Sequence, residues 1–347
     1  MLEDWPTEAR VRLEGVIEGH GRGARHFDAA RPPVAVFDWD NTSARGDVGD
    51  LAFAYMLDHD RVRWPEGGLG AWGALSAEAR ARIEEACPRG LAAGDVLPTS
   101  GESPCGVALA QIAIGDAVDG APAFDPAIGP QYRGSYGMMA RVFAGMTAAE
   151  ATQVGEAAIT RGLAQPVGAR RSIGGAELDD FLRIQEPVRA LWDRLRQAGF
   201  DVWIVSASFE PIVQAFAARA GLDPSHVIGA RLEVGADGRY LARHPYEDAI
   251  GPLLTFDEGK RFWIRHAIFG MSVEDAIGPI ADEDPRPVLA AGDSDTDFAM
   301  LESASALRVL FDRGAPRVTC LARVEPDLFV VVPEFVDPVP HAPVECP

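Results

Sequence analysis

The segment PVAVFDWDNT, residues 33–42, is the most informative part of the chain about its fold. Its first half is apolar on both faces, which is typical of a short strand buried in a parallel sheet. Its second half places Asp38 and Asp40 directly after that strand. Ligands of such sheets bind beyond the carboxyl ends of the strands. The stretch therefore predicts chemistry at this edge of a sheet, although an Asx-rich turn has the same composition.

Strands and helices alternate again after about residue 185. The predicted strands cover residues 201–205, 226–228, 287–291, 307–311 and 328–332. The predicted helices cover 187–198 and 211–220 and begin near residues 259 and 295. This alternation predicts an α/β fold with a doubly wound, Rossmann-like parallel sheet and right-handed crossovers. We expect the core at 1–46 and 186–332, an inserted helical unit at 47–185, and a Pro-rich tail at 333–347 that is extended or loose.

The inserted unit carries helix-start signals. Ser76 precedes one helical pattern, and Thr147 with Glu150 predicts a capping box for another. The Gly- and Pro-rich segment 94–137 gives no clear assignment. Residues 1–30 read as an amphipathic helix followed by a loop.

Composition narrows the classes of partner. The chain has 347 residues and a net charge of −20, so nucleic acid and anionic membranes are not expected partners. No apolar run approaches a membrane span. The acidic start MLEDWPTEARVRLEG is not a secretory signal. We expect a cytoplasmic protein, or a periplasmic or secreted one if a leader has been removed.

Four scattered cysteines, Cys87, Cys105, Cys320 and Cys346, lack zinc-site spacing. We expect free thiols. Pairing of Cys87 with Cys105, or of Cys320 with Cys346, stays open.

Two residue types occur only once. The basic residues are 31 Arg and a single Lys, Lys260, and the only Asn is Asn41. Arg cannot replace Lys where a compact ammonium is required. A surface role is the usual explanation for a lysine, but in a chain that otherwise uses Arg it is the weaker one.

Asp38 and Asp40 suit a two-step phosphoryl transfer. One carboxylate can attack phosphorus and form an aspartyl-phosphate. The other can protonate the leaving group and then deprotonate a water molecule. A carboxylate at position 40 argues against a dehalogenase, because a halide leaving group needs no proton.

Three further segments suit the same chemistry. In SAS, residues 206–208, hydroxyl and backbone N–H groups could cradle phosphate, although Ser208 could instead cap a helix. Lys260 could neutralise a phosphoryl group and an aspartate nucleophile. The run GDSDTD, residues 292–297, suits Mg²⁺, although a capped turn also explains it.

Taken together, these four segments resemble the motifs of the haloacid dehalogenase superfamily: DxDxT, a Ser after a strand, a Lys, and GDxxxD. The strings VFAGMTAAEA (142–151), WIVSASFEPIV (203–213) and VIGARLEV (227–234) resemble the phosphoserine phosphatase-like branch. DNT in the first motif and the long insertion look closest to phosphorylcholine phosphatases. Departures from the branch at Asn41 and Thr296 concern the substrate rather than the chemistry.

The resemblance implies a Mg²⁺-dependent phosphomonoesterase with an aspartyl-phosphate intermediate and a helical cap at 47–185. It implies that Asp38 is the nucleophile and Asp40 the acid and base. The implied phosphate-binding residues are Thr42, Ser206, Ala207 and Lys260. The implied metal ligands are Asp38, Asp40 through its carbonyl, and Asp293, with Asp297 in support.

The substrate depends on the insertion. In the family an acidic residue at the position of Asp47 holds an amino group, so Asp47 or Asp50 could hold a cationic head group, as in phosphocholine, with help from aromatic faces. Candidate aromatic residues are Trp39, Tyr55, Trp64, Trp72, Tyr132 and Tyr136. Arginines could instead bind a carboxylate, as phosphoserine requires; the candidates are Arg133, Arg141, Arg170 and Arg171.

Two other functions stay open: a phosphotransferase that passes the phosphoryl group to an alcohol, and a catalytically silent binding protein of the same fold. The sequence does not fix the oligomeric state.

Overall fold

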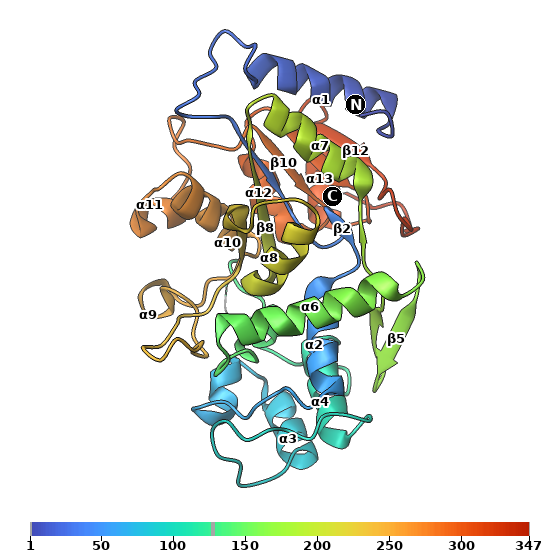
Figure 1. Ribbon diagram of the computed structural model, residues 1–347, viewed down its shortest axis with the longest axis vertical. Coiled ribbons are helices and arrows are strands. Elements are labelled where there is room, and N and C mark those ends of the chain that lie inside the picture. Colours follow the sequence, from blue (N-terminus) through green and yellow to red (C-terminus); the bar gives the residue numbers. More distant parts are fainter. Residues whose placement is uncertain (1, 126–128, 347) are drawn as a thin grey trace.

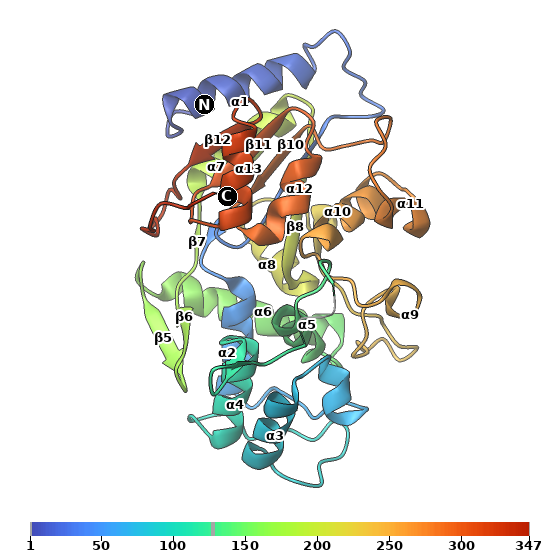
Figure 2. The ribbon, with the colours of Figure 1, turned by 180° about the vertical axis from the view of Figure 1, so that it is seen from behind.

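A computed structural model of the chain describes residues 2–125 and 129–346. Its centre is a six-stranded sheet in which every neighbouring pair is parallel (Figures 1 and 2). The strands, in spatial order, are β12 (Phe329–Val332), β11 (Leu307–Phe311), β10 (Leu289–Gly292), β1 (Val34–Phe37), β8 (Asp201–Phe209) and β9 (Val227–Ala230). The predicted doubly wound parallel sheet is confirmed.

Helices cover both faces of this sheet because its strands are apolar on both faces. The helices on one face are α1 (Thr7–His20), α7 (Glu186–Gln197) and α8 (Glu210–Arg219). Those on the other are α10 (Glu258–Trp263), α12 (Phe298–Ser303) and α13 (Pro316–Val324). The alternation is visible in β1, where Ala35 and Phe37 belong to the first core and Val34 and Val36 to the second.

The segment between β1 and α7 forms the lower lobe in Figure 1. Its helices are α2 (Val48–Asp58), α3 (Ala77–Ala86), α4 (Pro104–Ala113), α5 (Gly134–Arg141) and α6 (Ala148–Ala164), with a 3-10 helix η1 (Gly68–Trp72). Short strands pair as β3 (Ala117–Val118) with β4 (Ala121–Pro122), and β5 (Arg170–Ile173) with β6 (Ala176–Asp179). The ends of the lobe meet where β2 (Ala44–Arg45) pairs antiparallel with β7 (Arg183–Ile184).

A second excursion, between β9 and α10, lies beside this lobe. It contains α9 (Glu247–Ile250). The backbone oxygen of Tyr240, in this segment, accepts a hydrogen bond from the backbone N–H of Gly145 in the lobe at 2.8 Å. The buried guanidinium of Arg141 donates to Glu247 at 2.7 Å. The remaining elements are α11 (Val273–Ile277), η3 (Pro224–His226), η4 (Ile264–Ile268) and η5 (Asp295–Asp297).

The helix caps predicted inside the lobe are confirmed. Ser76 accepts from the backbone of Ala79 at 3.1 Å, and Thr147 forms the capping box with Glu150. The segment 94–137, for which the sequence predicts no clear assignment, holds α4, the β3–β4 pair and the start of α5. Residues 126–128 of that segment, like residues 1 and 347 at the chain ends, lie outside the described residues.

Strand β8 is longer than predicted. It continues through residues 206–208 to Phe209, with an irregular register against β9 between Val205 and Phe209. Helix α13 was not predicted, because its sequence PRVTCLARV is short and weakly apolar.

The expectation of free thiols is wrong. Cys87 pairs with Cys105, and Cys320 pairs with Cys346. Sequence spacing could not reveal this, because each pair becomes adjacent only in the folded chain. The second disulfide ties the Pro-rich tail to α13, so the tail is irregular but not loose. Disulfides persist in oxidising compartments, so this finding argues against the cytoplasmic expectation. Across residues 2–125 and 129–346, we find no helix with the length and apolar character of a membrane span.

Candidate active site

Asp38 follows β1 at the carboxyl edge of the sheet, where its backbone N–H donates to Ala291 O at 2.9 Å. The Nζ atom of Lys260, from α10, lies 2.5 Å from Asp38 Oδ1 and 2.6 Å from Asp297 Oδ1. The lysine side chain is completely buried. The surface-lysine alternative is therefore wrong, and the lone lysine is a partner of the predicted nucleophile.

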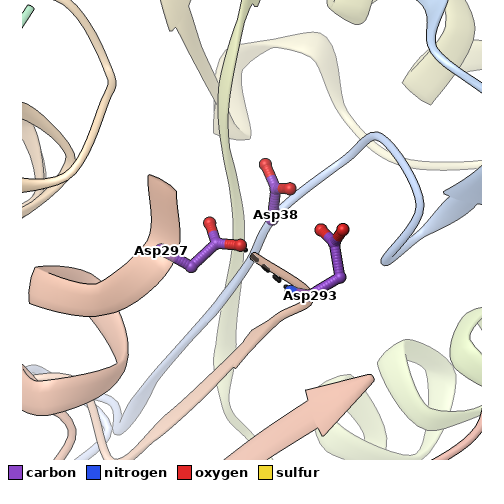
Figure 3. A group of neighbouring side chains, drawn as sticks. All are labelled: Asp38, Asp293 and Asp297. Carbon is purple, nitrogen blue, oxygen red and sulfur yellow. Dashed lines mark hydrogen bonds between the residues drawn. The ribbon is translucent and has the colours of Figure 1, made fainter. Parts of the chain in front are cut away.

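Asp293 and Asp297 follow β10, the strand beside β1. In Figure 3 the side chains of Asp38, Asp293 and Asp297 are neighbours, and one carboxylate oxygen from each lies within 4.8 Å of those of the other two. Asp297 Oδ2 accepts from the backbone of Asp293 at 3.0 Å and of Ser294 at 3.2 Å. Asp297 therefore also caps the turn, so the capped-turn alternative describes part of its role.

Asp40 faces the same place from the loop after β1. Its Oδ1 accepts from Val48 N at 2.8 Å, and its Oδ2 accepts from Ser208 Oγ at 2.7 Å. Ser206 Oγ lies 3.4 Å from the same oxygen and accepts from Ser208 N at 3.1 Å. Ser208 does not cap the next helix, whose N-cap is Phe209. The two serines instead orient the Asp40 carboxylate.

The loop 38–43 is held by its own side chains. Asn41 adopts a left-handed conformation with φ of 61°, which Asn tolerates better than most residues. Its Oδ1 accepts from Arg45 at 3.0 Å. Thr42 Oγ1 donates to Asp293 Oδ1 at 3.1 Å. The lone asparagine thus has a conformational role next to the nucleophile.

A cavity of about 290 Å³ opens beside these groups. Its polar wall carries Asp38, Asp40, Asn41, Asp47, Asp293, Asp295 and Arg313, and its apolar wall carries Met139, Ala140, Phe143, Phe209 and Ile212. Arg133 and Tyr136 also line it, as does Ala207. Of the four predicted phosphate-binding residues, Ala207 reaches the cavity surface, whereas Thr42, Ser206 and Lys260 are buried behind it.

The carboxyl groups here have raised pKa values. Burial, reinforced by the charge of Asp297, raises the pKa of Asp293 to about 7 and that of Asp38 well above its ordinary value. Burial, and next the charge of Asp47, likewise raises the pKa of Asp40. For Lys260, burial favours the neutral amine, but the Asp297 and Asp38 charges outweigh it and raise the pKa. The positive charges of Lys260 and Arg313 therefore do not fully offset burial and the repulsion between these carboxylates.

Oxygen-rich, electron-rich clusters of this kind fit a hard divalent cation. Asp297 is fully buried and does not line the cavity, and its oxygens accept hydrogen bonds from Lys260 and the backbone. Asp38 and Asp293 line the cavity and remain the better candidate ligands. The donor set thus fits Mg²⁺, with Asp297 in support.

Only some of the residues predicted to bind the head group line the cavity. Among the described residues, Asp47 lines the cavity and Asp50 does not. Of the candidate aromatic residues, Tyr136 lines the cavity, while Trp39 stacks on Trp192 in the core. Trp64 packs against Trp72, Tyr55 against His59, and Tyr132 against His244.

The candidate arginines likewise differ in whether they line the cavity. Arg133 lines the cavity and pairs with Asp116 at 2.9 Å. Arg141, Arg170 and Arg171 pair with Glu247, Asp179 and Asp58 respectively.

Sequence analysis missed Arg313, which lines the cavity and donates to Asp293 Oδ2 at 3.2 Å. It also missed Gln185, whose side chain donates to Thr42 O at 2.9 Å and supports the loop after β1. Ligands bind beyond the carboxyl ends of parallel strands. The same reasoning applied to β11 would have identified Arg313, which lies two residues after the end of that strand.

Two solved structures with TM-scores of 0.50 or more support the fold. A conserved functionally unknown protein from Anaerococcus prevotii DSM 20548 is 20% identical, with 92% of this chain and 90% of that chain covered and a TM-score of 0.61. A protein with unknown function from Bordetella pertussis Tohama I is 16% identical, with 87% and 98% covered and a TM-score of 0.50. A phosphoserine phosphohydrolase-like protein from Francisella tularensis subsp. tularensis SCHU S4 is 13% identical, with 87% and 95% covered and a TM-score of 0.41.

No curated protein matches the chain. The family model for haloacid dehalogenase-like hydrolases matches residues 121–302. That range contains Ser206, Lys260 and Asp293 but not Asp38, which the fold brings to Lys260 from outside it. The chain therefore belongs to the haloacid dehalogenase-like hydrolase family.

Proposed function

We propose that this hydrolase is a Mg²⁺-dependent phosphomonoesterase of the phosphoserine phosphatase-like branch. One observation carries the proposal: Lys260 joins the carboxylates of Asp38 and Asp297 beneath a cavity that Asp40 also faces. A buried ammonium next to a strand-end carboxylate suits a nucleophile that must approach an anionic phosphoryl group.

In the first step, an oxygen of Asp38 attacks phosphorus while the bond from phosphorus to the leaving oxygen breaks. Asp40 gives its proton to that oxygen and the alcohol departs. The raised pKa of Asp40, caused by burial and next by Asp47, favours the protonated form that this step needs. The hydrogen bonds from Val48 and Ser208 hold the carboxyl group in one orientation.

In the second step, the Asp40 carboxylate takes a proton from water, whose oxygen attacks the phosphorus of the aspartyl-phosphate. The bond between phosphorus and Asp38 breaks, which releases inorganic phosphate and restores both aspartates. Lys260 offsets negative charge at Asp38 throughout, because its Nζ is fixed between two carboxylates.

A bound Mg²⁺ would offset the charge of the phosphoryl group and the carboxylates. We assign Asp38, Asp293 and the backbone carbonyl of Asp40 as its protein ligands, with Asp297 in support. The gathered oxygens and raised pKa values of Asp38 and Asp293 support this assignment.

For the substrate, we propose a small phosphomonoester with a cationic or amino head group, such as phosphocholine or phosphoserine, selected by residues 47–185 acting as a cap. The cavity volume of about 290 Å³ supports a small leaving group. Asp47 supplies a carboxylate at its wall, and Tyr136 supplies an aromatic face. Arg133 would suit the carboxylate of phosphoserine instead.

The test is a screen of phosphocholine, phosphoethanolamine, phosphoserine and an aryl phosphate, each with Mg²⁺ and with excess chelator. We expect phosphate release that requires Mg²⁺ and is absent in Asp38→Asn. Phosphoryl transfer to added alcohols in place of water would favour the phosphotransferase. No release from any ester would favour the silent binding protein.

A further inference from the structure

Arg313 lies between two carboxylates in the cavity wall. Its Nη1 donates to Asp293 Oδ2 at 3.2 Å, and its Nε lies 3.7 Å from Glu334 Oε2. Thr42 donates to the other oxygen of Asp293 at 3.1 Å. The two oxygens of this candidate metal ligand are therefore held by two separate donors, which fixes the plane of the carboxylate.

Glu334 comes from the segment after β12, near the start of the Pro-rich tail. Its side chain is completely buried, and it does not line the cavity. It also lies 3.4 Å from Arg45 Nε, at the stem of the inserted lobe. A buried carboxylate needs a charged partner, and Glu334 has two.

We propose that Glu334 is a positioning residue that holds Arg313 against Asp293 and thereby strengthens divalent cation binding. The inference rests on the proposed cation site. Residues behind a metal ligand commonly fix its orientation, and their loss typically weakens metal binding.

The charges predict the direction in which Glu334→Gln changes cation binding. In Glu334→Gln, Arg313 keeps its positive charge, loses the compensating carboxylate and is no longer held in place. Both changes oppose a cation at Asp293. Arg313→Gln is different, because it removes a positive charge that repels the cation as well as a hydrogen bond that orients the ligand.

Glu334 could instead affect cation binding through Arg45. A double-mutant cycle distinguishes this explanation from an effect through Arg313. If Glu334 acts through Arg313, the effect of Glu334→Gln should disappear in an Arg313→Gln background. If it acts through Arg45 and the stem of the lobe, the effect should persist there. A general loss of structure would also persist and would lower the melting temperature.

The experiment measures Mn²⁺ binding to the full chain by electron paramagnetic resonance, together with the Mg²⁺ dependence of phosphate release. We expect Glu334→Gln to weaken Mn²⁺ binding about 10- to 100-fold, with kcat recovered at saturating Mg²⁺. In the Arg313→Gln background, the same change should alter binding by less than about 2-fold.

Glu325→Gln is the matched control. Glu325 pairs with Arg308, another arginine of the β11 region, at the opposite end of that strand. Its loss should leave Mn²⁺ binding unchanged. If Glu334→Gln does not fold, Arg313→Lys serves instead. Different nitrogens of the Arg313 guanidinium face Asp293 and Glu334, and lysine has a single nitrogen in their place. We expect binding about 10-fold weaker.

Equal binding by the parent and Glu334→Gln, or equal effects in both backgrounds, would overturn the role of Glu334 and leave the proposed function intact. Absence of Mn²⁺ binding to the parent chain would overturn both.

Discussion

The Nζ atom of Lys260 lies 2.5 Å from Oδ1 of Asp38, although 222 residues separate them in the chain. The lysine is fully buried and also bonds to Asp297 at 2.6 Å. A planar guanidinium cannot place its charge at the same point between two carboxylates. The chain uses Arg at 31 other basic positions, so the single exception coincides with the position where Arg does not fit.

We therefore expect Lys260→Arg to lower kcat at least about 10²-fold. Because the pocket of Lys260 is closed, we also expect a loss of about 1–3 kcal/mol in the free energy of unfolding. Rates should be measured well below the melting temperature. Arg261→Lys, the reverse exchange on the next residue, is the control and should remain fast. A Lys260→Arg enzyme as fast as the parent would remove Lys260 from the site.

Much of the site could be predicted because its residues obey a local rule. Asp38 and Asp293 lie at the ends of predicted strands, and parallel strands bring those ends to one edge. The same rule indicated Ser206, although β8 continues past it to Phe209. The sheet itself follows from short runs apolar on both faces, such as β1. Lys260 was predictable because its residue type is unique in the chain.

The remaining features depend on partners that only the fold brings together. In the sequence Glu334 is one residue of a Pro-rich tail. A role for its charge can be inferred only from the fold, which places it beside Arg313. The extension of β8 through Ser206 depends on pairing with β9 rather than on local pattern. The sequence leaves Asp47 and Asp50 as alternatives for the head group, and the structure separates them because Asp47 caps α2 and lines the cavity.

Substitution of the two aspartates of the first motif should impair different steps of the reaction. Asp38→Asn should abolish turnover, because an amide cannot attack phosphorus. Asp40→Asn should retain phosphoenzyme formation at a rate lower by about 10²–10⁴-fold, because proton transfer is lost. Rapid quenching followed by mass spectrometry would detect phosphate on Asp38. Full turnover by Asp38→Asn would contradict the mechanism.

Both disulfides should form in the purified protein. Each closes a loop, with sequence separations of 18 and 26 residues, and loops of this size correspond to about 3 kcal/mol of stability in a chain-entropy description. Thiol titration of the denatured chain should find no reactive thiol before reduction and four after it. Reduction should lower the melting temperature. Reactive thiols before reduction would contradict the pairing.

Asp47 and Asp50 provide a matched pair for substrate selection. Asp47→Asn keeps the helix cap, because Asn is as good an N-cap as Asp, but removes charge from the cavity wall. For esters with an ammonium head group we expect KM to rise about 10-fold, by analogy with the loss of a charged hydrogen-bonding partner. KM for an aryl phosphate should change little, and Asp50→Asn should have the smaller effect. Equal changes for all esters would contradict a head-group role.

The raised pKa values of the aspartates predict how pH affects stability and cation binding. Burial and the charge of Asp297 raise the pKa of Asp293 to about 7, from an unfolded value of 3.8. The folded protein therefore binds more protons than the unfolded chain between these values, and stability falls as pH rises through this range. Asp38 and Asp40 shift in the same direction.

A divalent cation competes with those protons and binds the ionised carboxylates. We therefore expect Mg²⁺ to raise the melting temperature more at about pH 8 than at about pH 5, because proton release precedes binding. Differential scanning fluorimetry with and without Mg²⁺ measures this difference. Asp293→Asn removes the group with the pKa near 7 and a proposed cation ligand, so it should reduce both the Mg²⁺ effect and its dependence on pH. A Mg²⁺ effect that is equal at both pH values, or larger in acid, would contradict the assignment of these aspartates to the cation site.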